Sequence, residues 1–215
     1  MKYKAIIFNL DGVICHTDHY HYLAWKQLAD RIGIEFDEGI NNRLKGVNRM
    51  DSLEIILEKW QGAPFSDEEK IKLVDEKNAL FKELLKEMSE QDLSKEVKDT
   101  LDHLRKRGFY LAIGSSSKNA RLILERIGMF SYFDAVSDGN NITSSKPDPE
   151  VFLKAAEFLN MKPSQCLVVE DAKAGIDAAK AAGMDSAAIA DAFGYSEATY
   201  NLFTFSKLVQ ICCAQ

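Results

Sequence analysis

The chain has 215 residues and a formal net charge of -6, with 46% hydrophobic and 28% charged residues, which is typical of a globular domain. The excess of 33 acidic over 27 basic residues argues against nucleic acid or an anionic membrane surface as a partner, and no segment approaches the roughly 20 apolar residues of a membrane helix. The four cysteines lack metal-site spacing and too few apolar residues follow Lys4 for a signal peptide, so we expect a cytoplasmic protein.

The first apolar run, residues 5–8, predicts a buried strand, and a long helical stretch follows it. Residues 19–86 contain no convincing strand, while 20–32, 51–60 and 67–86 have helical periodicity. We therefore predict an all-helical cap at 16–90, inserted into a core made of 1–15 and 91–215. The return linker is expected near 88–93.

The rest of the chain alternates strands and helices. Strands are predicted at 110–113, 135–136, 167–169 and 186–189, with a possible edge strand at 200–203. Helices are predicted at 95–107, 118–127, 149–159 and 172–182, with a short last helix capped by Ser206. This alternation predicts an α/β fold with a Rossmann-like parallel sheet and right-handed crossovers.

Polar side chains follow two of the predicted buried strands. Asn9 and Asp11 follow the first strand, and Glu170 and Asp171 follow the run at 167–169. Because ligands bind at the carboxyl ends of parallel strands, these side chains are expected to share one site. Adjacent buried acids need a cation, and Mg²⁺ prefers oxygen ligands. The alternative is that Asp171 only caps the following helix.

Two loops are candidate anion sites. Residues 114–119 place hydroxyls and backbone N–H groups before a predicted helix, although a serine that merely caps the helix is the alternative. Lys146 is followed by Pro147, and this stiff loop would hold the ammonium in one place. A solvated surface lysine is the alternative there.

In chain order, Asn9-Leu10-Asp11-Gly12, Ser115, Lys146-Pro147 and Glu170-Asp171 resemble the four motifs of the haloacid dehalogenase-like superfamily. The first motif of that superfamily is Asp-x-Asp-Gly. The resemblance implies Mg²⁺-dependent phosphoryl transfer, with residue 9 as nucleophile, Asp11 as acid and base, and Ser115 and Lys146 holding the phosphoryl group. It also implies metal binding by Asn9, Asp11, Glu170 and Asp171.

Residues of the predicted cap are similar to those of the sugar-phosphate mutases in this superfamily. The resemblance implies interconversion of β-glucose 1-phosphate and glucose 6-phosphate through an aspartyl phosphate and a bisphosphate, by a monomer. Residue 49 and residues 117–119 would grip the phosphate that is not transferred, residues 45–47 and 52 would line the sugar, and His21 would position Asp11. The implied substrate-binding residues are Thr17, His21, Trp25, Lys45, Gly46, Val47, Arg49, Ser52, Ser116, Ser117, Lys118 and Asn119.

Asn9 departs from the superfamily pattern. An amide oxygen is a far poorer nucleophile than a carboxylate, so we expect a protein that binds Mg²⁺ and sugar phosphate with almost no turnover. We interpret Asn9 as an introduced replacement of an aspartate in an otherwise working enzyme. A natural pseudoenzyme and slow activity after deamidation stay open. A sugar-phosphate phosphatase and a non-catalytic sugar-phosphate-binding protein are the alternative functions.

Overall fold

The computed structural model describes residues 2–44 and 47–213. The chain forms two compact units, which we call the sheet unit (Met1–His16 and Met88–Gln215) and the helical unit (Thr17–Glu87). The helical unit overlaps most of the predicted insertion at 16–90, and its role as a cap stays a prediction.

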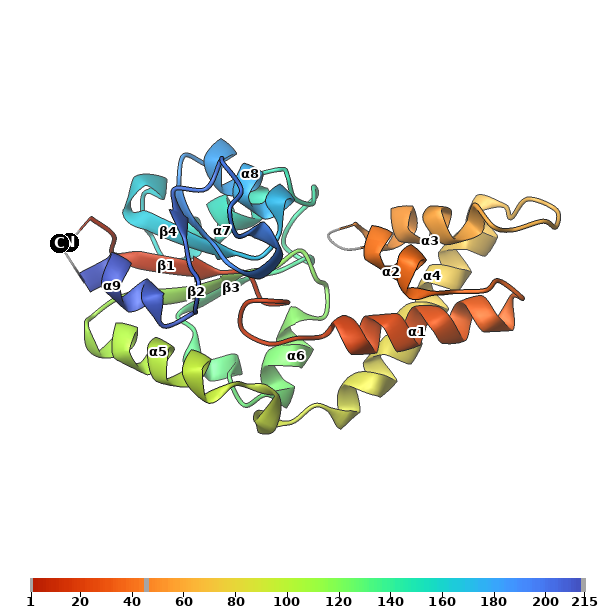
Figure 1. Cartoon of the computed structure of the whole chain (residues 1–215), viewed down its shortest axis with the longest axis horizontal. Helices are drawn as coiled ribbons and strands as arrows, with labels where there is room; N and C mark the ends of the chain where they lie inside the picture. Colours follow the sequence, from red (N-terminus) through yellow and green to blue (C-terminus); the bar gives the residue numbers. More distant parts are fainter. Residues whose placement is uncertain (1, 45–46, 214–215) are drawn as a thin grey trace. The chain divides into compact units, whose positions relative to one another are not determined.

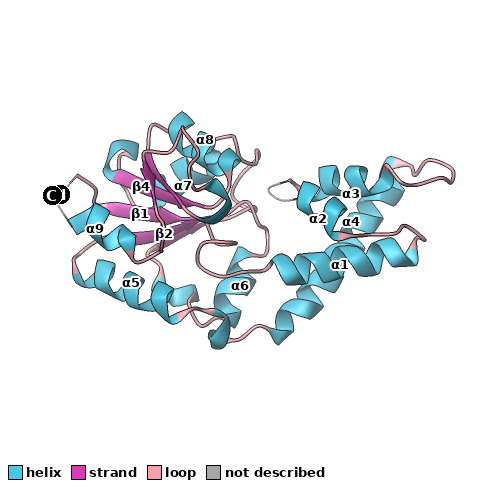
Figure 2. Cartoon of the chain, viewed as in Figure 1, coloured by secondary structure: helices cyan, strands magenta, loops and turns pink. Residues whose placement is uncertain are grey.

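The sheet unit is built on one six-stranded sheet with the order β3-β2-β1-β4-β5-β6, in which all neighbouring strands are parallel (Figures 1 and 2). The predicted parallel α/β fold is therefore confirmed. The central strand, β1, is buried along its whole length because helices cover both faces of the sheet. The strands are β1 (Ala5–Phe8), β2 (Tyr110–Gly114), β3 (Ala135–Ser137), β4 (Cys166–Glu170), β5 (Asp185–Ala188) and β6 (Tyr200–Asn201).

Helices α7 and α8 cover one face of the sheet, and α5 and α9 lie on the other (Figure 1). Phe152 of α7 is fully buried with Ile7, Ala112 and Val168 of the three central strands. The helices of this unit are α5 (Lys95–Lys106), α6 (Ala120–Arg126), α7 (Glu150–Phe158), α8 (Lys173–Ala181) and α9 (Lys207–Cys213). Short 3-10 turns lie at Glu90–Asp92, Phe130–Tyr132, Pro163–Gln165 and Ala190–Ala192.

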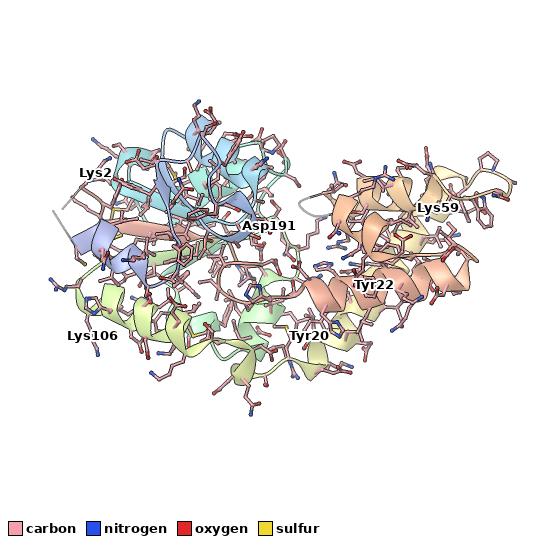
Figure 3. All side chains as sticks on the ribbon, viewed as in Figure 1. Lys2, Tyr20, Tyr22, Lys59, Lys106 and Asp191 are labelled. Carbon is pink, nitrogen blue, oxygen red and sulfur yellow. The ribbon has the colours of Figure 1, made fainter. Side chains whose placement is uncertain are left out.

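A polar cluster closes the amino-terminal edge of the sheet. The Tyr3 hydroxyl donates to Asp185 at 2.6 Å, and Lys2, labelled in Figure 3, pairs with the same carboxylate. Asp191, also labelled in Figure 3, follows β5 at the opposite, carboxyl edge, where the candidate site lies.

The helical unit contains α1 (Asp18–Arg31), α2 (Glu38–Arg43), α3 (Arg49–Leu57) and α4 (Asp67–Leu84), followed by a 3-10 turn at Leu85–Glu87 (Figure 2). Trp25, Leu28, Leu53 and Ile56 belong to its buried cluster. Helix α4 begins with a capping box between Ser66 and Glu69. This unit therefore has its own hydrophobic core.

Several predicted boundaries were wrong. The sequence interpretation missed α2, and it placed α3 at 51–60 although Asn48 caps this helix and Leu57 ends it. Helix α6 begins at Ala120, after the predicted start at 118, because residues 115–119 form a separate hydrogen-bonded loop. Across the described residues, every helix is too short or too polar to span a bilayer.

Candidate active site

Parallel pairing brings the predicted site residues to one edge of the sheet. Phe8 of β1 lies opposite Ile113 of β2 and Val169 of β4. The residues that follow these three positions are Asn9, Gly114 and Glu170, so they end neighbouring strands side by side. The sheet register thus places three of the predicted motifs next to one another at the carboxyl edge of the sheet.

Lys146 joins these three strand ends. Its Nζ donates to Asn9 Oδ1 at 3.1 Å and to the Gly114 carbonyl at 3.1 Å, and it forms an ion pair with Glu170 Oε1. The Lys146 side chain is 10% exposed and that of Glu170 is fully buried. Because an ammonium has three N–H donors, these contacts use all of them. The alternative of a solvated lysine is therefore wrong.

The Asn9 amide nitrogen lies within hydrogen-bond distance of two oxygen atoms. Its Nδ2 donates to the Asp11 carbonyl at 2.8 Å and to Asp171 Oδ1 at 2.9 Å. With a carboxylate at residue 9, three oxygens would converge there without an N–H donor between them, and a cation would satisfy all three. Across the described ranges 2–44 and 47–213, no three His, Cys, Asp or Glu side chains form a metal cluster. A cation would therefore rely on the backbone oxygen as well.

Glu170 and Asp171 have different surroundings. Glu170 Oε2 accepts from the backbone N–H groups of Asp171 and Ala172 at 2.9 and 3.0 Å, so both of its oxygens have protein partners. Its predicted role as a metal ligand stays a prediction. Burial and the neighbouring Glu170 carboxylate raise the pKa of Asp171 to about 7. Ala172, and not Asp171, is the N-cap residue of α8.

Gly12 lets Asp171 approach the first motif. Its φ of +79° is a backbone conformation that other residues rarely adopt. A Cβ atom at this position would lie 2.0 Å from Asp171 Oδ2. The glycine of the first motif is therefore required both by the turn and by the packing of the acidic side chain.

The serine-rich loop at 115–119 follows β2 at the same edge. Ser115 is buried, and its N–H donates to the Ser137 carbonyl of β3 at 3.0 Å. The Ser115 and Ser117 hydroxyl oxygens accept from the N–H groups of Ser117 and Asn119 at 3.1 and 3.2 Å. Helix α6 has no side-chain cap, so the alternative that these serines cap it is wrong.

In the helical unit, His21 contacts a buried lysine. Lys77 is 1% exposed, its Nζ lies 2.8 Å from His21 Nδ1, and it is 4.8 Å from the ring centroids of both Trp25 and Phe81. His21 also stacks on Phe81. Since an ammonium can only donate, His21 Nδ1 accepts and the imidazole is neutral. Burial, followed by the cations Lys77 and Arg49, lowers the pKa of His21 well below its usual value.

Thr17 and Ser52 are further predicted site residues that lie in the helical unit. Thr17 is buried directly before α1, Ser52 is buried on α3, and the Ser52 hydroxyl donates to the Val47 carbonyl at 3.5 Å. Lys45 and Gly46 lie outside the described residues. The substrate contacts implied for all of these residues stay predictions.

Sequence reasoning missed Lys77 and the turn at 138–141. A lysine in an amphipathic helix is usually solvated, and nothing in the sequence of α4 shows that two aromatic rings enclose this one. The turn itself could have been predicted from the run Asp138-Gly139-Asn140-Asn141, because these residue types are typical of turns. Its contact with the loop at 115–119 depends on the pairing of β2 with β3.

Removal of the Lys146 ammonium is expected to destabilise the sheet unit strongly. Lys146→Met leaves the Glu170 carboxylate buried and unpaired, and we expect the free energy of unfolding to fall by about 3–5 kcal/mol. The double variant with Glu170→Gln should recover most of this loss. As a control, Lys95→Met removes an exposed ion pair with Asp99 and should cost no more than about 0.5 kcal/mol. Urea unfolding of the four proteins measures these values, and equal losses in the two single variants would contradict the account.

Acid should weaken the helical unit through His21. The folded pKa of His21 is lower than the usual 6.5, so the unfolded chain binds more protons as the pH falls below about 6.5. Between about pH 7.5 and about pH 5 this contribution of His21 lowers the free energy of unfolding, whereas the raised pKa of Asp171 acts in the opposite direction and is common to both proteins. The parent should therefore lose stability relative to His21→Gln over this range. Denaturant unfolding at both pH values measures the free energy of unfolding of each protein. The control is His103→Gln, which changes an exposed histidine of α5. The same pH dependence in His21→Gln as in the parent would refute the assignment.

Comparison with known proteins agrees with this geometry. The model of the haloacid dehalogenase-like hydrolase family matches residues 3–183. The chain is 42% identical over 183 residues to the β-phosphoglucomutase of Bacillus subtilis, covering 84% of this chain and 80% of that protein. It is 31% identical over 184 residues to a phosphorylated carbohydrates phosphatase of Thermotoga maritima, covering 85% of this chain and 82% of the relative.

A solved structure is also similar over nearly the whole chain. The crystal structure of a β-phosphoglucomutase from Clostridium difficile superposes with a TM-score of 0.86 at 37% identity, covering 96% of this chain and 93% of the other. The family model extends over both units of the present chain. The chain belongs to the haloacid dehalogenase-like hydrolase family.

Proposed function

We propose that the chain has the scaffold of a β-phosphoglucomutase whose nucleophile position carries an amide. The observation that carries this proposal is the environment of residue 9. Its side chain lies between the Lys146 ammonium and two oxygens, from Asp11 and Asp171. These surroundings suit a carboxylate that is oriented by a lysine and shares a cation.

With aspartate at residue 9, the proposed first step is covalent transfer. A carboxylate oxygen bonds to the phosphorus on the first sugar position of the bisphosphate while the bond between that phosphorus and the sugar oxygen breaks, and Asp11 gives its proton to the leaving oxygen of glucose 6-phosphate. The aspartyl phosphate then passes its phosphoryl group to the free 6-hydroxyl of β-glucose 1-phosphate, Asp11 takes the hydroxyl proton, and the bisphosphate and the free carboxylate form again. Ser115 and Lys146 are proposed to hold the phosphoryl oxygens during both steps, with Lys146 exchanging one of its present acceptors, residue 9 or the Gly114 carbonyl, for a phosphoryl oxygen.

The residues present fit a divalent cation. Asp171, the Asp11 carbonyl and the side-chain oxygen of residue 9 are proposed to hold Mg²⁺. When bound, Mg²⁺ supplies positive charge that stabilises the oxygens of the phosphoryl group. The other proposed ligand, Glu170, acts through its contacts with Lys146 and the Asp171 N–H.

Asn9 keeps the contacts of this site while it removes the nucleophile. The amide oxygen accepts from Lys146, and the amide N–H groups donate to the Asp11 carbonyl and to Asp171 Oδ1. We propose that the Asn9 site binds Mg²⁺ and a sugar phosphate without covalent transfer. Asn9 is interpreted as a replacement of aspartate, and the encoded codon distinguishes this from a natural pseudoenzyme.

A sugar-phosphate phosphatase is the second candidate, because a relative at 31% identity is a phosphorylated carbohydrates phosphatase. In that reaction water, and not a sugar hydroxyl, attacks the aspartyl phosphate. The mutase is favoured by further candidate phosphate contacts, which are Arg49 and residues 117–119. A mutase needs them because it must bind both phosphate groups of the bisphosphate. A non-catalytic sugar-phosphate-binding protein has only Asn9 in its support.

Restoring the carboxylate should restore turnover. In phosphorus NMR with β-glucose 1-phosphate, Mg²⁺ and a trace of the sugar bisphosphate, we expect Asn9→Asp to form glucose 6-phosphate. Its rate should exceed that of the Asn9 protein by at least on the order of 10³-fold, since the nucleophile is lost in the latter.

A matched control tests the second carboxylate. Asp11→Asn in the Asn9→Asp background should also be nearly inactive, because it cannot transfer the proton. Inorganic phosphate as the main product would make the protein a phosphatase. Equal turnover by the Asn9 and Asn9→Asp proteins, or none by either, would overturn the mutase proposal.

A further inference from the structure

The turn between β3 and α7 lies against the serine-rich loop through three hydrogen bonds. The Ser115 N–H donates to the Ser137 carbonyl at 3.0 Å, and the Gly139 N–H donates to the Ser117 carbonyl at 3.1 Å. Asn140 Nδ2 donates to the Lys118 carbonyl at 3.0 Å. The loop is thus bound by the last residue of β3 at Ser115, and by two residues of the turn at the carbonyls of Ser117 and Lys118.

This turn is itself rigidly held. Asp138 is fully buried, and its Oδ1 accepts from the Asn140 N–H at 2.8 Å. Its own N–H donates to Asn141 Oδ1 at 3.0 Å, while the Asn141 N–H donates back to the Asp138 carbonyl at 2.9 Å. Arg121 of α6 forms an ion pair with the second carboxylate oxygen at 3.4 Å. The turn can therefore act as a fixed template.

Gly139 approaches the loop so closely that no side chain fits. A Cβ atom there would lie 2.4 Å from the Ser116 carbonyl oxygen and 2.8 Å from the Lys118 nitrogen. Both of these are backbone atoms, so they cannot move out of the way by a rotamer change. Any side chain at residue 139 must therefore displace the loop, and a methyl group would cover the Lys118 N–H.

The loop offers donors that its internal bonds leave unused. The Ser117 and Asn119 N–H groups bond to serine oxygens, whereas those of Ser116 and Lys118 have no hydrogen-bond partner within the part of the chain that the structure describes. The Ser116 hydroxyl oxygen is buried and also has no partner there. A phosphate oxygen is an acceptor that backbone N–H groups and hydroxyls without a protein partner can bind.

We infer that the turn at 138–141 sets the conformation of the phosphate-binding loop, and that Gly139 and Asn140 are positioning residues for the affinity of a sugar phosphate. This inference rests on the proposed function, because it takes residues 115–119 as a phosphate grip. Neither residue touches the substrate. Each acts through the backbone of residues 116–118.

The test is calorimetric titration of glucose 6-phosphate into the Asn9 protein and its variants. Gly139→Ala and Asn140→Asp should raise the dissociation constant between about ten- and a hundred-fold, as expected for donors displaced by a fraction of an ångström to one ångström. Asn140 is exposed, so its variant keeps the test valid if Gly139→Ala fails to fold. The control is Gly183→Ala, which strains a positive φ of +70° after α8 and should lower the melting temperature without changing the affinity.

The possible results separate this inference from the proposed function. If the parent binds, Lys118→Ala binds weakly and Gly139→Ala binds like the parent, the positioning role is wrong while the proposed function stands. If the parent does not bind glucose 6-phosphate, both fail. In the Asn9→Asp background, a raised KM with kcat within about two-fold would support positioning, and an unchanged KM would refute it.

Discussion

The ammonium of Lys146 is the contact on which the site depends. It joins the ends of β1, β2 and β4 by donating to Asn9, the Gly114 carbonyl and Glu170. A buried charge is tolerated only when its partners are complete, and here each donor has one acceptor from a different strand. The same contacts fix the orientation of the residue 9 side chain, so the stability of the sheet edge and the geometry of the site have a common origin.

The Asn9 side chain forms a hydrogen bond with each of its three neighbours. An asparagine and an aspartate have nearly the same shape, and the asparagine satisfies Lys146 with its oxygen and the Asp11 and Asp171 oxygens with its N–H groups. Compared with an aspartate, this asparagine lacks a negative charge and a nucleophilic carboxylate, and it adds N–H donors toward the Asp11 and Asp171 oxygens.

Much of the sheet unit could be predicted because its central strands are continuous apolar runs, and a short parallel strand buried on both faces has few alternatives. The position of residues 9 and 170 directly after buried strands also predicted that they share one site, and the resemblance to the superfamily added Lys146. The prediction failed where tertiary contacts decide: α2 is short, Lys77 is enclosed by rings from two helices, and the turn at 138–141 needs the β2–β3 pairing to reach the loop. A local sequence pattern does not show which residues from distant parts of the chain come into contact.

The central claim is that this site lacks only the carboxylate of residue 9 for covalent phosphoryl transfer. The most direct measurement is intact-protein mass spectrometry with peptide mapping, after incubation of the Asn9 and Asn9→Asp proteins with the sugar bisphosphate and Mg²⁺. The account predicts one phosphoryl group on residue 9 of the Asn9→Asp protein and none on the Asn9 protein. A phosphoryl group on another residue of the Asn9→Asp protein, or equal labelling of both proteins, would contradict it.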